Sequence, residues 1–206
     1  MSAHKRIGIL GGSFDPVHNG HVLMADRAHH LLGLDIVLFI PTNISPFKVG
    51  KTNTDAAHRK NMLDLALAEY GDKFQVSTID IDRGGISYTI DTIEQLRQIY
   101  RNAELFYIMG ADSLVTLFKW HRANELVAQV KFVTFARQDF PLMNGDIFGF
   151  NEEQTKLLKQ NIFYDFCCNI SSTQIRKRIA TQQSVDGMIS GNVIKYVREH
   201  NLYTTV

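Results

Sequence analysis

The sequence is poor in the features that mark several classes of protein. Its two cysteines, Cys167 and Cys168, are adjacent in the chain and therefore unsuited to an ordinary disulfide bond. This excludes a disulfide-stabilised secreted domain and predicts a reducing compartment, the cytoplasm. The apolar run near the N-terminus, residues 7–10, is too short for a signal peptide or a membrane span. We therefore expect no membrane partner.

The sequence also lacks an excess of charge of either sign. Lys and Arg number 22 against 21 Asp and Glu, which gives a net charge of +1. No general basic field is available to recruit nucleic acid, so any anionic partner must be bound by local groups. Only four prolines are present, and no linker or repeat interrupts the 206 residues. We predict a single domain spanning residues 1–206.

Short apolar runs rich in β-branched and aromatic residues recur along the chain and predict strands. Segments with apolar residues at intervals of three and four, such as Ile90, Ile93 and Leu96, follow them and predict helices. The predicted strands are residues 7–10, 36–40, 74–81, 105–109 and 131–136. This alternation predicts an α/β fold with a Rossmann-like, doubly wound parallel sheet. Ligands bind such sheets beyond the carboxyl ends of the strands.

Unusual residues gather in the loop after the first predicted strand, residues 11–21, with the sequence GGSFDPVHNGH. Paired glycines, Gly11 and Gly12, let a ligand approach the backbone closely. His18 and His21 then reach the start of a predicted helix, where free amides and the helix dipole favour phosphate. We predict a phosphate site that uses no lysine.

Other readings of this loop are weaker. It matches neither G-x-G-x-x-G nor G-x-x-x-x-G-K-[ST], so the motifs of dinucleotide dehydrogenases and P-loop NTPases are both missing. His18 and His21 could ligate a metal, but zinc needs further protein ligands and the adjacent cysteines form no C-x-x-C pair. We predict no metal held directly by the protein. A glycine-rich turn with two capping histidines remains the structural alternative.

A second anion-suited helix start lies near the other end of the chain, at residues 171–176, with the sequence SSTQIR. It offers the hydroxyls of Ser172 and Thr173 and the guanidinium of Arg176 beside free backbone amides. An ordinary Ser/Thr cap with a solvated basic turn is the alternative. Two such helix starts in one open sheet fit a triphosphate better than two unrelated caps.

With both motifs present, the sequence resembles the nucleotidyltransferase superfamily, whose signatures are (T/H)-x-G-H and [ST]-[ST]-x-x-[IV]-R. Further segments resemble the bacterial nicotinate-nucleotide adenylyltransferases in matching order, at residues 41–48, 87–92, 110–112 and 120–122. The resemblance covers nearly the whole chain. It implies a step of NAD biosynthesis in which AMP passes from ATP to nicotinate mononucleotide. The products are nicotinate adenine dinucleotide and pyrophosphate, and the attack is in-line without a covalent intermediate.

The resemblance also implies which residues bind ATP. His18 and His21 would hold the phosphates, with His21 at the transferring α-phosphate, and Arg176 would bind the terminal groups as the third catalytic residue. The ATP-binding residues that it implies are Gly11, Gly12, Ser13, Phe14, His18, Gly20, His21, Gly110, Asp112, Ser172, Thr173 and Arg176. Asp112 would bind the adenosine ribose, with a helix cap as its alternative. Mg²⁺ would be bound through the ATP phosphates and its own waters, which requires no carboxylate cage.

The acceptor half of the site is likewise implied by the resemblance. Its residues would be Lys48, Ser87, Tyr88, Thr89, Trp120, His121 and Arg137. Trp120 would stack on the pyridine ring, and backbone amides near Thr89 and His121 would bind the ring carboxylate. Core packing is the alternative for Trp120, as solvated surface charge is for Lys48 and Arg137.

Two positions depart from the family pattern. Phe47 stands where the family segment usually reads Pro-His-Lys, and Ser13 replaces a frequent threonine. Asp15 precedes Pro16, and we expect it to brace the loop rather than to take part in the chemistry.

Other functions fit the sequence less well. Nicotinamide mononucleotide and phosphopantetheine are alternative acceptors, although residues 87–92 and the single tryptophan argue against phosphopantetheine. A catalytically silent nucleotide-binding regulator would have lost a motif histidine or arginine, and this chain keeps them. The sequence leaves open whether the protein forms a homo-oligomer.

Overall fold

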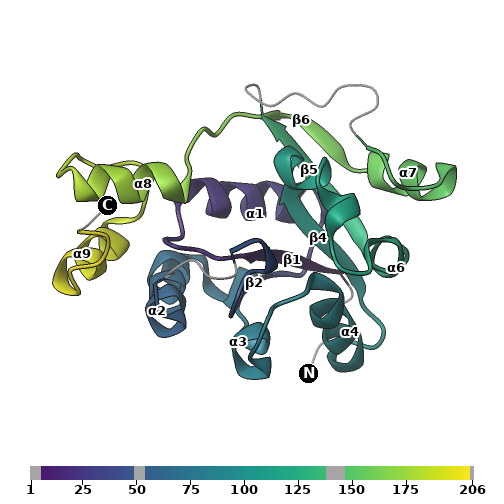
Figure 1. Cartoon of the computed structure of the whole chain (residues 1–206), viewed down its shortest axis with the longest axis horizontal. Coiled ribbons are helices and arrows are strands. Elements are labelled where there is room, and N and C mark those ends of the chain that lie inside the picture. The colour runs from purple at the N-terminus through teal and green to yellow at the C-terminus, as the bar shows by residue number, and fades with distance from the viewer. Residues whose placement is uncertain (1–5, 49–53, 138–146, 205–206) are drawn as a thin grey trace.

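Six parallel strands form one sheet in the order β3-β2-β1-β4-β5-β6 (Figure 1). The computed structural model describes residues 6–48, 54–137 and 147–204. The strands are β1 (Arg6–Gly12), β2 (Ile36–Pro41), β3 (Phe74–Val76), β4 (Glu104–Gly110), β5 (Lys131–Arg137) and β6 (Ile162–Phe166). This is the doubly wound, Rossmann-like arrangement that the alternation of the sequence predicts.

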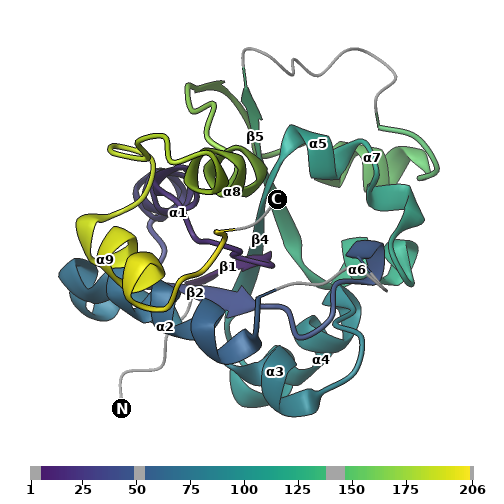
Figure 2. The ribbon, with the colours of Figure 1, turned by 60° about the vertical axis from the view of Figure 1, so that its left-hand side comes forward.

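Helices follow the strands and cover the sheet, as Figures 1 and 2 show from two sides. They are α1 (Asn19–Leu32), α2 (Ala56–Leu67), α3 (Ile79–Arg83), α4 (Thr89–Ile99), α5 (Ala111–Leu114), α6 (Ala123–Gln129), α7 (Glu152–Lys159), α8 (Ser172–Ala180) and α9 (Gly191–Glu199). Short 3₁₀ turns lie at η1 (Pro46–Lys48), η2 (Ala68–Lys73) and η3 (Leu117–Lys119). None of the helices in the described ranges is long and apolar enough to cross a membrane.

The two faces of the sheet carry separate hydrophobic clusters. Successive side chains of a strand point to opposite faces, so Ile9 packs on one side of β1 and Leu10 on the other. Helices α4, α6 and α7 pack against the face of Ile9, whereas α1, α2, α8 and α9 pack against the face of Leu10. Burial on both faces explains why the central strands read as continuous apolar runs.

Two predicted elements differ from the structure. The strand predicted at residues 74–81 ends at Val76, and its last three residues begin α3 instead. Asp80 in that helix is buried and accepts a hydrogen bond from the Thr92 hydroxyl at 2.5 Å, which ties α3 to α4 rather than to the sheet. Strand β6 was not predicted because it lies at the sheet edge, where exposed Tyr164 and Asp165 interrupt the apolar run.

Candidate active site

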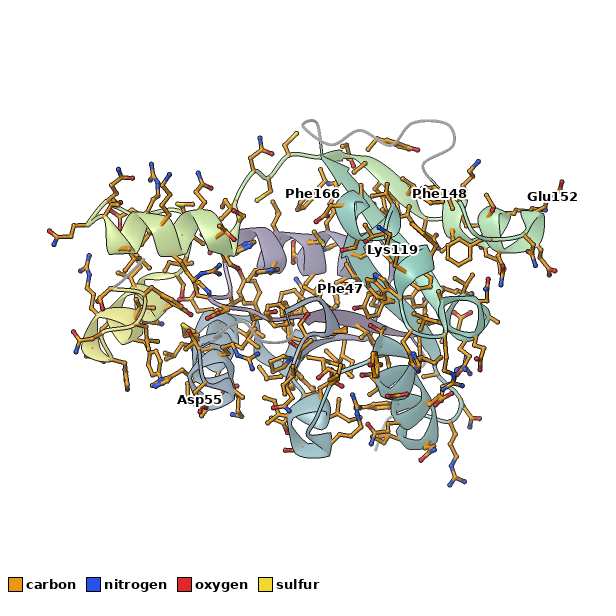
Figure 3. All side chains as sticks on the ribbon, viewed as in Figure 1. Phe47, Asp55, Lys119, Phe148, Glu152 and Phe166 are labelled. Atoms are coloured by element: carbon orange, nitrogen blue, oxygen red, sulfur yellow. The ribbon has the colours of Figure 1, made fainter. Side chains whose placement is uncertain are left out.

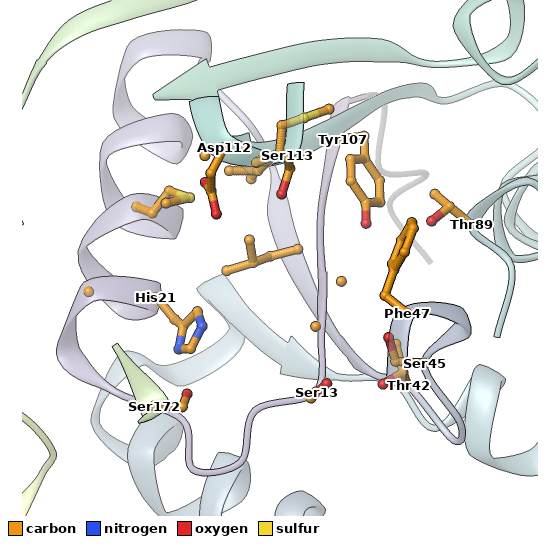
Figure 4. A pocket seen from close by; sticks show the side chains of 18 of the residues that line it. Ser13, His21, Thr42, Ser45, Phe47, Thr89, Tyr107, Asp112, Ser113 and Ser172 are labelled. Carbon is orange, nitrogen blue, oxygen red and sulfur yellow. The ribbon is translucent and has the colours of Figure 1, made fainter. Parts of the chain in front are cut away.

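The strand order reverses between β1 and β4, and the candidate site lies at this point. In an open parallel sheet such a reversal leaves a crevice beyond the carboxyl ends of the two strands. Here the strands end at Gly12 and Gly110, and a cavity of about 700 Å³ opens beside them. Figure 4 shows this cavity between the start of α1, the end of β4 and the turn that carries Phe47. Its volume is within the range usual for small-molecule sites.

Most of the residues predicted from the sequence line this cavity. They are Gly11, Gly12, Ser13, His18, Gly20, His21, Ser87, Tyr88, Thr89, Gly110, Asp112, Trp120, His121 and Ser172. Phe14, Thr173 and Arg176 are not among the residues that line it. The backbones of Lys48 and Arg137 end η1 and β5, but their side chains lie outside the described part of the structure.

Tyr107 of β4 lines the cavity beside Thr89. A Cβ atom at Gly11 would lie 2.7 Å from the Tyr107 hydroxyl oxygen, so a larger residue at this position would displace the Tyr107 side chain. Burial raises the pKa of Tyr107 to about 12, partly opposed by a hydrogen bond with Thr89, so the hydroxyl stays protonated at neutral pH. Sequence reasoning missed Tyr107 because nothing distinguishes it from its core neighbours in β4.

His18 and His21 form one unit at the start of α1. His18 is the N-cap residue, and its backbone N–H donates to Nδ1 of His21 at 3.2 Å. The two imidazole rings stack with their centroids 3.6 Å apart. Burial, and secondarily the neighbouring His18, holds the pKa of His21 well below its usual value. His21 is therefore neutral, with its proton on Nε2, because Nδ1 already accepts a hydrogen bond.

Phe14 supports this unit from below. Its side chain is 2% exposed, and its ring meets the His21 ring edge-on at a centroid distance of 5.0 Å. Phe14 also packs on Phe39 of β2, which fixes it to the core. The structure thus assigns Phe14 a packing role beneath His21. A direct contact between Phe14 and ATP stays a prediction.

The second predicted motif meets the first across the loop after β1. The Ser172 hydroxyl donates to the carbonyl of Pro16 at 2.9 Å, and Nη1 of Arg176 donates to the carbonyl of Asp15 at 2.7 Å. Nη2 of Arg176 also bonds the Thr173 hydroxyl at 3.3 Å. These bonds dock the start of α8 on the loop that leads into α1. The N-termini of both helices therefore belong to one site.

Asp15 braces the loop, as the sequence predicts. Its carboxylate is buried and accepts hydrogen bonds from the Tyr203 hydroxyl at 2.6 Å and the Thr54 backbone N–H at 3.4 Å. Burial, followed by the effect of Asp15, raises the pKa of Tyr203 far above its usual value, so the hydroxyl remains a donor. Tyr203, near the C-terminus, thus holds the loop between β1 and α1 in place.

The loop after β2 is fastened in a similar way. Arg59 of α2 is 2% exposed, and its guanidinium donates to the carbonyls of Ser13, Thr42 and Thr54 at 2.7–2.9 Å. Burial lowers the pKa of Arg59, although the group stays charged. One buried side chain therefore links the loops that follow β1 and β2, and both loops line the cavity.

The other half of the cavity is aromatic and rich in hydroxyls. Trp120 is half-buried and meets Tyr107 edge-on at a centroid distance of 5.7 Å, so it packs on the core and also lines the cavity. Tyr88 packs on His121 with their centroids 4.4 Å apart. Thr89 begins α4, whose first backbone amides have no partner within the helix. This half can receive a flat ring bearing a hydrogen-bond acceptor.

Asp112 lines the cavity from α5, beyond the end of β4. Asp112 is the second residue of α5, and the N-cap of this helix is Gly110, so Asp112 is not the N-cap residue. The Asp112 carboxylate is exposed and points into the cavity (Figure 4). Cys168 also lines the cavity, where its Sγ would lie 2.9 Å from a Cβ at Gly20. Its presence there depends on the course of the chain after β6, which the sequence did not reveal.

The donor set suits phosphate rather than a bare metal ion. The part of the cavity at the starts of α1 and α8 presents hydroxyls, a neutral imidazole and helix-terminal amides. Within the described residues, no group of three or more His, Cys, Asp or Glu side chains is arranged to hold a metal.

Comparison with known proteins identifies the family. A model of the cytidylyltransferase-like family matches residues 9–178. The nicotinate-nucleotide adenylyltransferase of Bacillus subtilis (strain 168) is 38% identical over 205 residues, which cover 97% of this chain and 98% of that protein. A probable enzyme of the same name from Thermoanaerobacter sp. (strain X514) is 37% identical over 98% of this chain and 96% of its own length. The chain belongs to the nicotinate-nucleotide adenylyltransferase family.

Solved structures support the fold of this adenylyltransferase. The nicotinic acid mononucleotide adenylyltransferase of Plasmodium falciparum, solved in complex with NaAD, has a TM-score of 0.77 at 21% identity and covers 98% of this chain and 99% of its own. A structure described as a putative nicotinate-nucleotide adenylyltransferase from Vibrio parahaemolyticus has a TM-score of 0.71 at 18% identity, over 98% of this chain and 97% of its own. The chain therefore shares its overall fold with these solved structures.

Proposed function

We propose that this adenylyltransferase transfers AMP from ATP to nicotinate mononucleotide, releasing pyrophosphate and nicotinate adenine dinucleotide in NAD biosynthesis. The observation that carries the proposal is the meeting of the α1 and α8 N-termini at one cavity whose other half is aromatic. The names of the curated relatives support the same reaction.

The phosphate half would bind ATP. Amides at the start of α1 and α8 carry partial positive charge, and the Nε2 proton of His21 adds a donor aimed at the α-phosphate. Gly11 and Gly12 would allow the nucleotide to lie against the backbone, and Asp112 would accept from the ribose hydroxyls. Thr173 and Arg176 would reach the terminal phosphates once ATP competes with the carbonyl of Asp15 that Arg176 now contacts.

Mg²⁺ would arrive with ATP as its phosphate complex. This ion prefers oxygen ligands and keeps several waters, so the phosphate oxygens of ATP together with water can complete its coordination without a ligand from the protein. When bound, it would neutralise charge that develops on the leaving pyrophosphate.

The aromatic half would bind the acceptor. Trp120 offers a face to the pyridine ring, and amides near Thr89 and His121 would donate to both oxygens of its carboxylate. An amide group would present its own N–H donors to these amides and leave buried groups unpaired. Ser87 and Tyr88 would shape this side of the cavity, while Lys48 and Arg137 remain predicted contacts for the acceptor phosphate.

The chemistry requires no general base. A phosphate monoester is mostly dianionic at neutral pH because its second pKa is about 6, so it can attack the α-phosphorus directly. Catalysis then consists of aligning two anions and stabilising the charge of the transition state. His18 would keep His21 oriented, and Arg176 would act on the departing pyrophosphate. The free thiols of Cys167 and Cys168 support a reducing, cytoplasmic location.

Pyrophosphate release tests this proposal. The purified enzyme is incubated with Mg-ATP and, in separate reactions, with nicotinate mononucleotide, nicotinamide mononucleotide or phosphopantetheine. We expect release with the nicotinate compound and an efficiency with its amide that is lower by about 10⁴-fold or more. A His21→Ala variant should fold normally and lose at least about 10²-fold in turnover, which assigns the activity to this cavity. Release only with another acceptor, or equal efficiency with acid and amide, contradicts the proposal.

A further inference from the structure

Phe47 is an unusual side chain in this cavity. It is large and apolar, yet 58% of its surface is exposed. The ring extends from η1 into the cavity on the side where Tyr107 and Thr89 lie, as Figure 4 shows. In the view of all side chains, Phe47 lies near the centre of the picture (Figure 3). An isolated exposed phenylalanine is ordinary on a protein surface, but one that enters a substrate cavity calls for a physical reason.

The turn that carries Phe47 is held firmly. A β-bridge joins Ile44 to Ile86, and the Ser87 backbone N–H donates to the carbonyl of Ile44 at 2.9 Å. The Asn43 backbone N–H in turn donates to the Ser87 hydroxyl at 2.8 Å. These bonds fix the loop after β2 to the segment that leads into α4. The backbone that leads into η1 is therefore held in place, and an exposed side chain such as that of Phe47 can change rotamer readily.

Trp120 stands opposite Phe47. The two ring centroids are 6.3 Å apart, and the ring planes are inclined by 52°. Carbon atoms of stacked groups lie about 3.5–4.0 Å apart, so two rings that hold a third between them are separated by about 7–8 Å. The observed separation is slightly shorter than this. A change in the Phe47 side-chain torsions that turns the ring parallel to Trp120 and moves its centroid outward by about 1 Å would open a space for one flat ring, while Trp120 stays packed against Tyr107.

Resting on the proposed function, we propose that Phe47 and Trp120 form a two-sided aromatic slot for the pyridine ring of the acceptor. In a mononucleotide this ring is alkylated on nitrogen and carries a positive charge. The faces of both aromatic side chains are negative, so each attracts such a ring more strongly than an uncharged one. A histidine at this position, the usual family residue, would offer a weaker face and would repel the ring whenever it is protonated.

Binding of the acceptor to the intact enzyme tests the slot without relying on turnover. Trp120 is the only tryptophan, so its fluorescence reports the ring that stacks on it. Nicotinate mononucleotide is titrated into the wild type and into Phe47→Leu, Phe47→Tyr and Phe47→His. We expect the Kd to rise about 10-fold in Phe47→Leu and Phe47→His and to stay within about twofold in Phe47→Tyr. The KM for ATP should not change in any of them.

Phe148→Leu is the matched control. Phe148 is also an exposed aromatic residue, at 51%, but it packs on Phe118 and does not line the cavity. Its substitution should leave the Kd unchanged. A wild type that binds the acceptor with the same Kd as Phe47→Leu overturns the slot and leaves the proposed function standing. A wild type that neither binds nor adenylylates nicotinate mononucleotide overturns the proposed function and the slot together.

Discussion

His21 is held as a neutral hydrogen-bond donor by its surroundings. Its Nδ1 accepts from the backbone of His18, its ring lies on Phe14, and burial disfavours the charged imidazolium. The proton on Nε2 is then fixed in place before the substrate arrives. Such preorganised donors lose no energy to reorientation during the reaction, which is why they are effective in stabilising phosphoryl charge.

The lowered pKa of His21 predicts how stability depends on pH. The unfolded chain gains a proton on this residue near pH 6.5, whereas the folded protein does not until the pH is lower. Acidification through pH 6.5 therefore favours the unfolded state, by at most about 1.4 kcal/mol per pH unit for one proton. Urea unfolding of the wild type and His21→Gln between pH 8 and pH 5.5 measures this effect. The wild type should lose stability more steeply, and parallel profiles would refute the assignment.

Residues with a local signal could be predicted from the sequence, whereas those placed by packing could not. Gly11, Gly12 and His21 stand out because paired glycines and histidines at a helix start are readable in the order of residues. The packing of Phe14 against His21 could not be predicted, because its burial depends on contact with Phe39, which is distant in the sequence, whereas its predicted contact with ATP stays a prediction. Tyr107 gave no signal at all for the same reason.

At the scale of elements, the site depends on fastenings between loops that follow different strands. Arg59 of α2 joins the loops after β1 and β2, and Ser172 and Arg176 of α8 join the loop before α1. The sequence predicted the loops as ligand sites from the strand and helix alternation alone. It did not reveal Arg59, because one arginine in a polar helix reads as a surface residue.

Loss of the hydrogen bonds from Arg59 to the loops after β1 and β2 should lower the stability of the fold. Arg59→Met keeps much of the side-chain volume but leaves the carbonyls of Ser13 and Thr42 without their donor, and we expect a loss of about 2–4 kcal/mol in the free energy of unfolding. Urea unfolding measures it. Arg59→Lys keeps the charge but has a single nitrogen, so its free energy of unfolding should lie between those of the wild type and Arg59→Met. Lys60→Met on the exposed face of the same helix is the control and should change little. An unfolding midpoint of Arg59→Met equal to that of the wild type would show that the Arg59 hydrogen bonds do not stabilise the fold.

Across the whole molecule, the C-terminal part of the chain packs against the loop between β1 and α1. Tyr203, near the C-terminus, bonds the buried carboxylate of Asp15, and Asn19 at the start of α1 donates from its backbone to the carbonyl of Met188. The alternation of elements predicted the parallel sheet and the edge at which ligands bind. It could not predict these closures, because contacts between distant segments leave no periodic trace in the sequence.

The bond between Tyr203 and Asp15 should contribute measurably to stability. Tyr203→Phe removes one hydroxyl and leaves a buried carboxylate with a missing donor, so we expect a loss of about 1.5–3 kcal/mol. Tyr164→Phe removes the same hydroxyl from a residue that is 63% exposed and should change stability by less than about 0.5 kcal/mol. Equal unfolding midpoints for the two variants would show that the hydrogen bond between Tyr203 and Asp15 does not contribute to stability.

We propose that both substrates occupy one cavity and react directly, with His21 as a donor and not as a nucleophile. The stereochemistry at the α-phosphorus tests it most directly. ATP with sulfur in place of one α-phosphoryl oxygen, in a single configuration, is converted with nicotinate mononucleotide, and the configuration of the product is determined. One in-line displacement predicts inversion. Retention would require two successive displacements through an adenylylated side chain, and it would contradict the account.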